Sequence, residues 1–424
     1  MHRIVIINYV IMCLFFISYS YQFFYVAVSL LSTTKPHSKT ELHRFAVLIA
    51  ARNEESVIGN LIDSIRAQNY PKEFVDIYVA ADNCTDSTAM TAQSHGAEVY
   101  SRSDTGHIGK GYVLNFLLEQ IGRNKPDIKY DAYLVLDADN VLSVDYITEM
   151  NKTFSDGYEV ITSYRNSKNY GANWISAGYA LWFLHEAKYL NQARMALGSS
   201  CAVSGTGFIF SDRVIKECGG WHFFLLTEDI EFTIHNVVKG RKIGYCPTAV
   251  LYDEQPTDFR QSWRQRLRWS RGYLQVFHRY GISLLSGICH GSFSCYDMTM
   301  NIMPATLLTC LSLVINTSAS IMNFYAGRDL SVLGKSVLET VINLCLTLFI
   351  LGGITTATEW KNIYCPWYKK VIYTFTFPFF MMTYLPICIV SLFKDPSWQP
   401  IYHKCDVNLS QIKAAKADDT LFGK

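Results

Sequence analysis

The sequence predicts an α/β domain inserted between transmembrane α-helices, and three observations support this fold class. Residues 4–31 are an apolar run without a charged side chain, and the sequence becomes apolar again from about residue 296. Between them, over residues 33–280, apolar runs of strand length alternate with amphipathic stretches. A membrane crossing needs about 20 apolar residues, whereas this alternation is typical of a parallel sheet covered by helices. The chain therefore combines membrane segments with one α/β domain of ordinary size.

Composition narrows the class of protein before any motif is considered. Half of the 424 residues are hydrophobic and 17% are charged, against about 25% charged residues in typical soluble chains. The formal net charge is +2, so no nucleic-acid partner is expected. The twelve cysteines are scattered without a C-x-x-C pair, which argues against a zinc knuckle and fits a reducing compartment. A disordered chain and an ordinary soluble enzyme are both disfavoured.

The apolar segments predict four membrane helices. The run at 4–31 is longer than the apolar core of a signal peptide, so we expect an uncleaved helix. Three further spans follow at 296–324, 335–358 and 370–393, the last of them interrupted by Pro378 and Pro386. Prolines are tolerated in membrane helices, although a proline-broken segment can also be re-entrant. The alternative, that these spans are buried core helices, requires four such runs in one soluble fold.

The positions of lysine and arginine predict the orientation. Lys35, Lys39 and Arg44 follow the first span, which places the α/β domain in the cytosol. Four crossings would put the C-terminal tail outside, yet its lysines favour the inside, so both placements stay open. We divide the chain into a transmembrane helix 1–32, a cytosolic α/β domain 33–255, interfacial amphipathic helices 256–290, transmembrane helices 291–395 and a polar tail 396–424. An integral protein of a bacterial plasma membrane is expected.

Polar side chains gather where three apolar strands end. Asn53 and Glu55 follow FAVLIAA, Asp82 ends VDIYVAAD, and Asp137 and Asp139 follow AYLVL. Because ligands bind at the carboxyl edge of parallel strands, these groups predict a nucleotide pocket. Two carboxylates at i and i+2 suit Mg²⁺ or Mn²⁺ bound to a diphosphate. A D-x-D triplet alone is more often part of a solvated loop.

Two further motifs lie in the second half of the domain. Glu228 and Asp229 follow Thr227 ahead of an amphipathic stretch, where they could simply favour the helix dipole. Gln265, Arg268 and Trp269 lie within residues 257–285, which are rich in arginine and aromatic residues. Arginine pairs with diphosphate oxygens and tryptophan stacks on sugar rings. The alternative is a helix that anchors in the membrane interface, and residues 174–195 have the same character.

The ordered set of Asp82, Asp137-Ala138-Asp139, Thr227-Glu228-Asp229 and Gln265-x-x-Arg268-Trp269 resembles glycosyltransferase family 2. The resemblance spans about residues 45–275 and is to the membrane-embedded branch with the cellulose, chitin and hyaluronan synthases. It implies a GT-A-type domain with a UDP-sugar donor. Asp82 would contact uridine, and Lys110 would approach the phosphates. Asp137 and Asp139 would hold Mg²⁺ or Mn²⁺. Asp229 would be the general base beside Glu228, and Gln265, Arg268 and Trp269 would close over the diphosphate and receive the acceptor.

The resemblance implies an inverting hexosyltransferase with UDP-glucose or UDP-N-acetylglucosamine as donor. Our first hypothesis is a processive synthase that extends a β-linked polysaccharide and couples synthesis to membrane export, with export or accessory subunits as further partners. The alternative is a transferase that adds one sugar to a membrane lipid. A catalytically inactive scaffold of an export complex is a third hypothesis, which the presence of every motif carboxylate disfavours.

Overall fold

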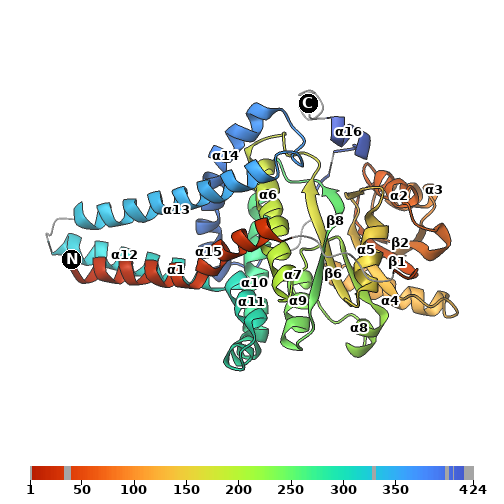
Figure 1. Ribbon diagram of the computed structural model, residues 1–424, viewed down its shortest axis with the longest axis horizontal. Coiled ribbons are helices and arrows are strands. Elements are labelled where there is room, and N and C mark those ends of the chain that lie inside the picture. Colours follow the sequence, from red (N-terminus) through yellow and green to blue (C-terminus); the bar gives the residue numbers. More distant parts are fainter. Residues whose placement is uncertain (1, 33–39, 327–330, 397–400, 404, 415–424) are drawn as a thin grey trace.

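The computed structural model describes residues 2–32, 40–326, 331–396, 401–403 and 405–414 (Figure 1). Its α/β domain is built on one mixed sheet of eight strands in the order β3-β2-β1-β4-β7-β6-β8-β5. The strands are β1 Phe45–Ala51, β2 Val75–Asp82, β3 Glu98–Arg102, β4 Ala132–Asp137, β5 Val141–Leu142, β6 Val160–Ser167, β7 Phe208–Ser211 and β8 Ile243–Asp253. The predicted parallel pairing holds for β1 to β4, while β7 runs antiparallel to β4 and β6.

Helices cover both faces of the sheet because its strands are apolar on both sides. In β1, Ala46 and Leu48 face one buried cluster, whereas Phe45, Val47 and Ile49 face the other. The second face carries α2 Ile58–Arg66, α3 Thr88–Ser94 and α5 Tyr146–Ser155. The first carries α4 Lys110–Asn124, α6 Trp174–His185, α7 Gln192–Leu197, α8 Asp212–Glu217 and α9 Glu228–Val238. This two-sided burial is the physical reason for the continuous apolar strands in the sequence.

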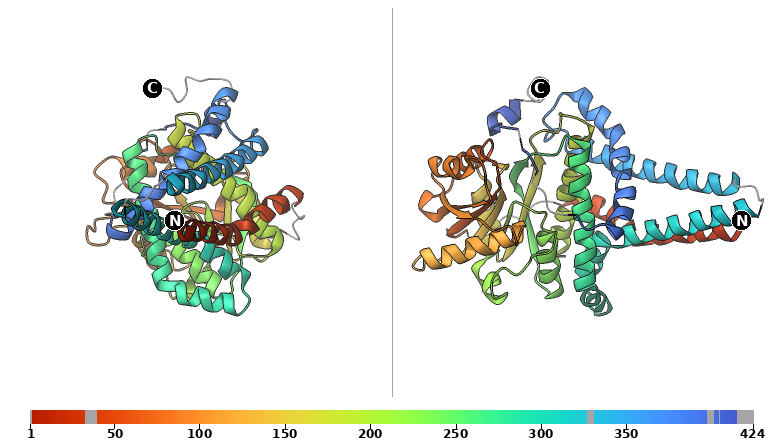
Figure 2. Two further views of the ribbon diagram at one scale, coloured as in Figure 1. Left: turned by 90° about the vertical axis from the view of Figure 1, so that its left-hand side faces the viewer. Right: turned by 180° about the vertical axis from the view of Figure 1, so that it is seen from behind.

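Three helices project together from the α/β domain: α1 His2–Leu31, α12 Pro304–Tyr325 and α13 Ser331–Thr358 (Figures 1 and 2). Within the described residues, three segments are long and apolar enough to cross a membrane, namely Ile6–Leu31, Val337–Thr358 and Trp367–Phe393. The last is divided into α14 Trp367–Met382 and α15 Tyr384–Phe393. Both run crosswise to the projecting helices and along the base of the domain (Figure 2). The segment therefore continues through Pro378 and breaks at Thr383.

The predicted span 296–324 corresponds to two helices rather than one. Residues Phe293–Ile302 form α11, and α12 begins at Pro304 after a break at Met303. Asp297 in α11 is fully buried and its carboxylate accepts hydrogen bonds from Nε and Nη2 of Arg194 at 2.7 and 3.0 Å. This ion pair ties α11 to α7, so α11 packs on the α/β domain.

The arginine-rich stretch forms one long helix, α10 Phe259–Cys289, which packs against α9, α11 and α15. Helix α6 lies between the sheet and α14, and most of its side chains are buried. Helix α6 thus connects the sheet to α14, and α10 connects α9 to α11 and α15.

The polar tail returns to the α/β domain. The Cys405 N–H donates to Oε2 of Glu254 at 2.9 Å, and Val407 and Ile412, the latter in α16 Leu409–Ala414, pack with Val141 and Tyr252. The described part of the tail thus packs on the α/β domain.

Candidate active site

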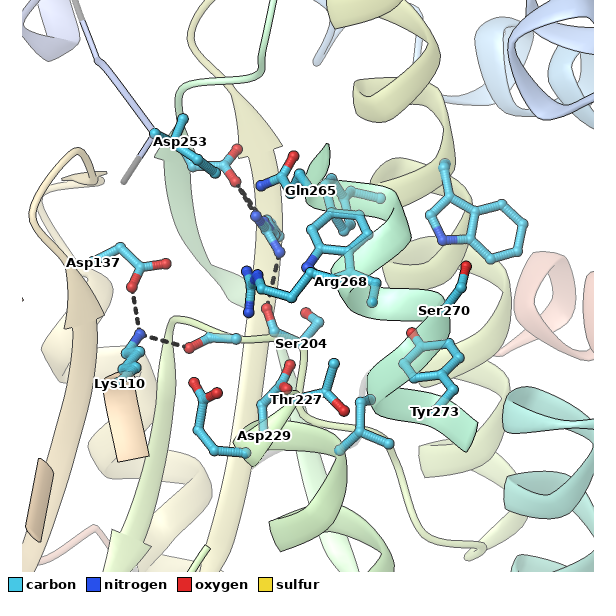
Figure 3. A pocket seen from close by; sticks show the side chains of 18 of the residues that line it. Lys110, Asp137, Ser204, Thr227, Asp229, Asp253, Gln265, Arg268, Ser270 and Tyr273 are labelled. Atoms are coloured by element: carbon cyan, nitrogen blue, oxygen red, sulfur yellow. Dashed lines mark hydrogen bonds and ion pairs between the residues drawn. The ribbon is translucent and has the colours of Figure 1, made fainter. Parts of the chain in front are cut away.

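One cavity of about 470 Å³ opens at the carboxyl edge of the sheet and reaches α11, α14 and α15. Figure 3 shows side chains from the strand ends and from α10 pointing into the same space. The structure brings together nine of the sequence-predicted residues on its wall: Asp82, Lys110, Asp137, Asp139, Glu228, Asp229, Gln265, Arg268 and Trp269.

Asn53 and Glu55 are placed differently. Asn53 Oδ1 accepts the Thr85 N–H at 2.8 Å, and Glu55 Oε2 accepts the Ser87 N–H at 2.8 Å. Their neighbours Arg52 and Glu54 line the cavity. Asn53 has a left-handed backbone, with φ of 58°, so the strand alternation ends there. Asn53 and Glu55 bind the loop after β2.

Lys110 and Asp137 form an ion pair where α4 begins and β4 ends (Figure 3). Nζ of Lys110 also donates to the Gly205 carbonyl at 2.8 Å. The Asp137 N–H donates to Oγ1 of Thr206 at 2.9 Å, which fixes the turn after β4. Lys110 begins α4, so its ammonium joins the start of that helix to the Asp137 carboxylate.

Asp139 and the tail residue His403 meet deeper in the same region. Oδ2 of Asp139 accepts the Glu254 N–H at 2.7 Å and lies 4.0 Å from Nε2 of His403. Burial alone would lower the pKa of His403, but the Asp139 and Glu54 carboxylates raise it to about 10. The sequence carried no signal for this histidine, because the tail reaches the site only in the folded chain.

The donor set at Asp137 and Asp139 fits a hard divalent cation. Both are carboxylates on the cavity wall, and oxygen ligands are those that Mg²⁺ and Mn²⁺ prefer. Among the residues that the structure describes, no three histidine, cysteine or acidic side chains are grouped to hold a metal ion. A cation at this position would therefore take further ligands from a diphosphate and from water.

Asp82 is buried at the end of β2, and its Oδ1 accepts a hydrogen bond from Nη1 of Arg102 at 2.6 Å. The partner explains how a carboxylate is tolerated there, since buried charges are paired. Asp82 also lines the cavity, so the pair leaves a carboxylate edge facing its interior.

Glu228 and Asp229 open α9, and the positive charge of Lys110 is close enough to lower the pKa of both. Burial, together with the neighbouring Asp229, raises the pKa of Glu228 to about 7. Burial also raises the pKa of Asp229, while its backbone hydrogen bond and Arg268 oppose the shift. Two adjacent carboxyl groups thus titrate nearer to neutral pH, as a general base requires.

Helix α10 contributes Gln265, Arg268 and Trp269 to the same cavity, and Figure 3 shows the first two pointing into it. Nη1 of Arg268 donates to the Leu226 carbonyl at 2.8 Å, which ties α10 to the start of α9. Oε1 of Gln265 is buried without a hydrogen-bond partner in the described residues. Trp269 packs edge-on against Tyr179, with 5.7 Å between ring centroids, and the cavity borders the indole.

Sequence reasoning missed a second ion pair on the wall. Nε of Arg165 donates to Oδ2 of Asp253 at 2.5 Å, its Nη1 donates to the Ser204 carbonyl at 2.9 Å, and its guanidinium lies 3.7 Å from the Phe183 ring centroid. Burial raises the pKa of Asp253 to about 6 although Arg165 opposes it. Asp253 ends β8, so the strand-end pattern that singled out Asp82 could have found it.

The far end of the cavity is apolar and faces the membrane helices. Its lining there comes from α11, the break before α12, α14 and α15: Met300, Ile302, Met303, Met381, Tyr384, Leu385 and Cys388. One cavity therefore joins a charged end at the strand edge to an apolar end at the foot of α12.

The chain is similar to known glycosyltransferases. Residues 43–272 match the model of "Glycosyltransferase like family 2". A β-monoglucosyldiacylglycerol synthase of Synechocystis sp. is 25% identical over 55% of this chain and 48% of its own length. A poly-β-1,6-N-acetyl-D-glucosamine synthase of Staphylococcus aureus is 23% identical over 56% of this chain and 57% of its own. The chain thus matches about half the length of these curated relatives.

Among solved structures, a mannosyltransferase of Pyrobaculum calidifontis, in complex with GDP-Man and Mn²⁺, superposes with a TM-score of 0.58 and 13% identity. The alignment covers 91% of this chain and 99% of that one, which shows a shared fold. The GT-A-type fold expected from the sequence is confirmed. The family match covers more than half of the residues and includes every motif on the cavity wall. The chain belongs to the family 2-like glycosyltransferases.

Proposed function

We propose that this protein transfers a hexosyl group, with inversion, from a UDP-sugar to a hydroxyl group of an acceptor at a membrane face. The observation that carries this proposal is that one cavity joins a charged end and an apolar end. Its charged end holds the motif carboxylates and Lys110, and its apolar end lies at the foot of the membrane helices. Donor and acceptor would enter from these two ends and meet near Asp229.

The chemistry follows from the residues on the wall. Asp229 takes the proton of the acceptor hydroxyl, whose oxygen forms a bond to the anomeric carbon. The bond from that carbon to the diphosphate oxygen breaks on the opposite face, and UDP leaves with the electron pair. Arg268 and Lys110 lie where they would stabilise the charge of the leaving diphosphate. General-base help of this kind contributes about 10²–10⁴-fold to rate.

A divalent cation, Mg²⁺ or Mn²⁺, would be held by Asp137 and Asp139, and it would supply charge neutralisation at the diphosphate. On the nucleotide side, Asp82 would accept hydrogen bonds from uridine. Asn53 and Glu55, which bind the loop after β2, would act only by holding that loop in place.

The membrane arrangement that fits this site has α1, α12 and α13 crossing the bilayer. In that arrangement α14 and α15 lie at the membrane–water interface, because they run crosswise to the three projecting helices (Figure 2). Lys361, Lys369 and Lys370 lie between α13 and the body of α14, and Lys35, Lys39 and Arg44 follow α1. The positive-inside rule then places the α/β domain and the tail in the cytosol, where UDP-sugars are present. The bacterial relatives support a bacterial plasma membrane.

The apolar end of the cavity favours an acceptor that is anchored in the membrane. Methionine, isoleucine and leucine side chains line it, and they suit a lipid chain better than a polar glycan. We therefore give a lipid-anchored acceptor precedence over the growing β-linked polysaccharide. The polysaccharide remains the second candidate because Trp182 and Trp269 offer aromatic faces to successive sugars.

The test is a transfer assay with protein in nanodiscs, Mg²⁺ or Mn²⁺, and a panel of radiolabelled UDP-sugars. Label in the lipid fraction as a single-sugar product is expected. A product of high molecular weight would make the processive synthase correct. Free sugar and UDP alone would show a competent donor site without its acceptor or accessory partner. No UDP release from any donor would support the inactive scaffold and refute the proposal.

A further inference from the structure

Glu186 is a carboxylate on the cavity wall that none of the steps above uses. It lies at the start of a π-helical turn, Glu186–Asn191, which directly continues α6. π-Helical turns are rare in proteins, and those that occur often lie at functional sites. The cavity borders its side chain together with Asp229, Trp269 and Tyr273.

Glu186 has no hydrogen-bond or ion-pair partner among the described residues. The two arginines with the strongest charge effect on it are engaged elsewhere, because Arg165 pairs with Asp253 and Arg194 pairs with Asp297. Burial raises the pKa of Glu186 and Asp229 adds to the shift. A ligand that donates hydrogen bonds to a carboxylate in such a place would stabilise it.

The groups around Glu186 indicate which class of ligand could donate hydrogen bonds to it. A diphosphate is excluded, since two anions would repel each other. The hydroxyl of Tyr273, which is flanked by the Glu186 and Asp229 carboxylates, also has no partner in the described part of the chain. Trp182, one turn before Glu186, and Trp269 supply flat apolar faces on the same wall. Carboxylate, phenol and indole together suit a sugar ring, with hydroxyl groups at its edge and C–H groups on its face.

We infer that Glu186 binds hydroxyl groups of a sugar ring in the acceptor, so that the acceptor ends in a sugar and is not a simple lipid alcohol. A simple alcohol offers one hydroxyl, and Asp229 would take its proton. An acceptor that carries further hydroxyl groups can also donate hydrogen bonds to Glu186. This inference rests on the proposed function and specifies its acceptor class as a glycolipid or a glycan end. Glu186 is thus a specificity residue that orients the acceptor.

The experiment compares acceptors with and without a sugar. Wild-type protein in nanodiscs is given octyl β-D-glucopyranoside, octyl N-acetyl-β-D-glucosaminide or dioleoylglycerol. UDP release without any acceptor is measured in parallel as donor hydrolysis. The variants are Glu186→Gln and Glu186→Asp. The matched control is Glu119→Gln, on the exposed face of α4, where the side chain is 49% exposed.

Glu186→Gln is expected to raise the KM for the used glycoside about 10- to 100-fold, as loss of a charge-assisted hydrogen bond does. Donor hydrolysis and donor KM should stay within about twofold of wild type, because the donor end of the site is untouched. Glu186→Asp should recover part of the acceptor affinity, and Glu119→Gln should change nothing.

Three outcomes would overturn the inference. They are an unchanged KM for the glycoside in Glu186→Gln, an equal rise in KM for dioleoylglycerol, and a wild-type enzyme that uses dioleoylglycerol but neither glycoside. Each would leave the proposed function intact, because donor hydrolysis reports it separately. A wild-type enzyme that releases no UDP from any donor would instead refute the proposed function.

Discussion

Nδ1 of His403 lies 2.9 Å from Oε1 of Glu54, although 349 residues separate them. The other ring nitrogen lies 4.0 Å from Oδ2 of Asp139. The imidazole therefore stands beside one of the two carboxylates that we propose as cation ligands. A cation at Asp139 and the His403 ring must compete for the same oxygen unless the ring turns away.

His403→Ala is accordingly expected to lower the Mn²⁺ concentration that gives half-maximal UDP release, because it frees Asp139. Manganese titration of donor hydrolysis measures this value. Lys413→Ala, in the exposed part of α16, should leave it unchanged. A higher manganese requirement in His403→Ala would show the reverse, namely that the ring helps to hold the cation.

The fall of the transfer rate at low pH should result from protonation of the Glu228–Asp229 pair. Burial and Asp229 raise the pKa of Glu228 to about 7. Asp229 must be ionised to accept a proton, so the transfer rate should rise with pH as the pair ionises near neutrality. In Glu228→Gln the adjacent negative charge is lost. The pKa of Asp229 should then fall, and the fall of the transfer rate should move about one unit to lower pH.

A kcat profile from pH 5 to 8.5 with saturating substrates checks this shift. Asp229→Asn should abolish transfer at every pH while donor binding, followed by calorimetry, persists. A Glu228→Gln profile identical to wild type would show that the two carboxyl groups titrate independently. Residual transfer by Asp229→Asn at a comparable rate would remove Asp229 from the base role.

Trp269→Ala should reduce transfer to the acceptor more than donor hydrolysis. The indole borders the cavity and packs on Tyr179 and Phe183, at 5.7 and 6.2 Å between ring centroids. Loss of a stacking face costs about 0.5–1.5 kcal/mol in binding, so the acceptor KM should rise about 2- to 10-fold while kcat for hydrolysis changes little. Trp269→Phe should retain part of the acceptor affinity. An equal loss in both reactions would place Trp269 at the donor.

The sequence was informative where local pattern determines structure. Apolar strands that end in carboxylates predicted Asp82, Asp137 and Asp139 on one edge, and the cavity wall contains all three. In the loop after β1, the same strand-end pattern did not identify the side chains that line the cavity. There the left-handed backbone of Asn53 turned Arg52 and Glu54 to the cavity in place of Asn53 and Glu55.

Contacts between distant segments could not be predicted. The tail meets Glu54 and Asp139 only because it crosses the sheet edge, and no spacing in the chain encodes that path. Hydropathy identified residues 370–393 as long and apolar enough to cross a membrane, as Trp367–Phe393 are in the structure, but it does not report the direction in which such a segment runs. The crosswise path of α14 and α15 comes from their packing on α6 and α10.

Asp297→Ala should destabilise the protein far more than Asp395→Ala, although each removes one partner of an arginine ion pair. Asp297 and Arg194 are fully buried and the Asp297 carboxylate also accepts hydrogen bonds from Tyr21 and Tyr25 of α1, at 2.8 and 2.9 Å. Asp395 is 73% exposed and pairs with Arg271. An uncompensated buried arginine costs about 3–5 kcal/mol, whereas an exposed pair is worth about 0–1 kcal/mol. Thermal unfolding in detergent should therefore show a large fall in Tm for Asp297→Ala only, together with easier proteolytic release of α1. Equal Tm values in the two variants would mean that Arg194 finds another partner or reaches water, and that the ion pair does not hold α1 on the α/β domain.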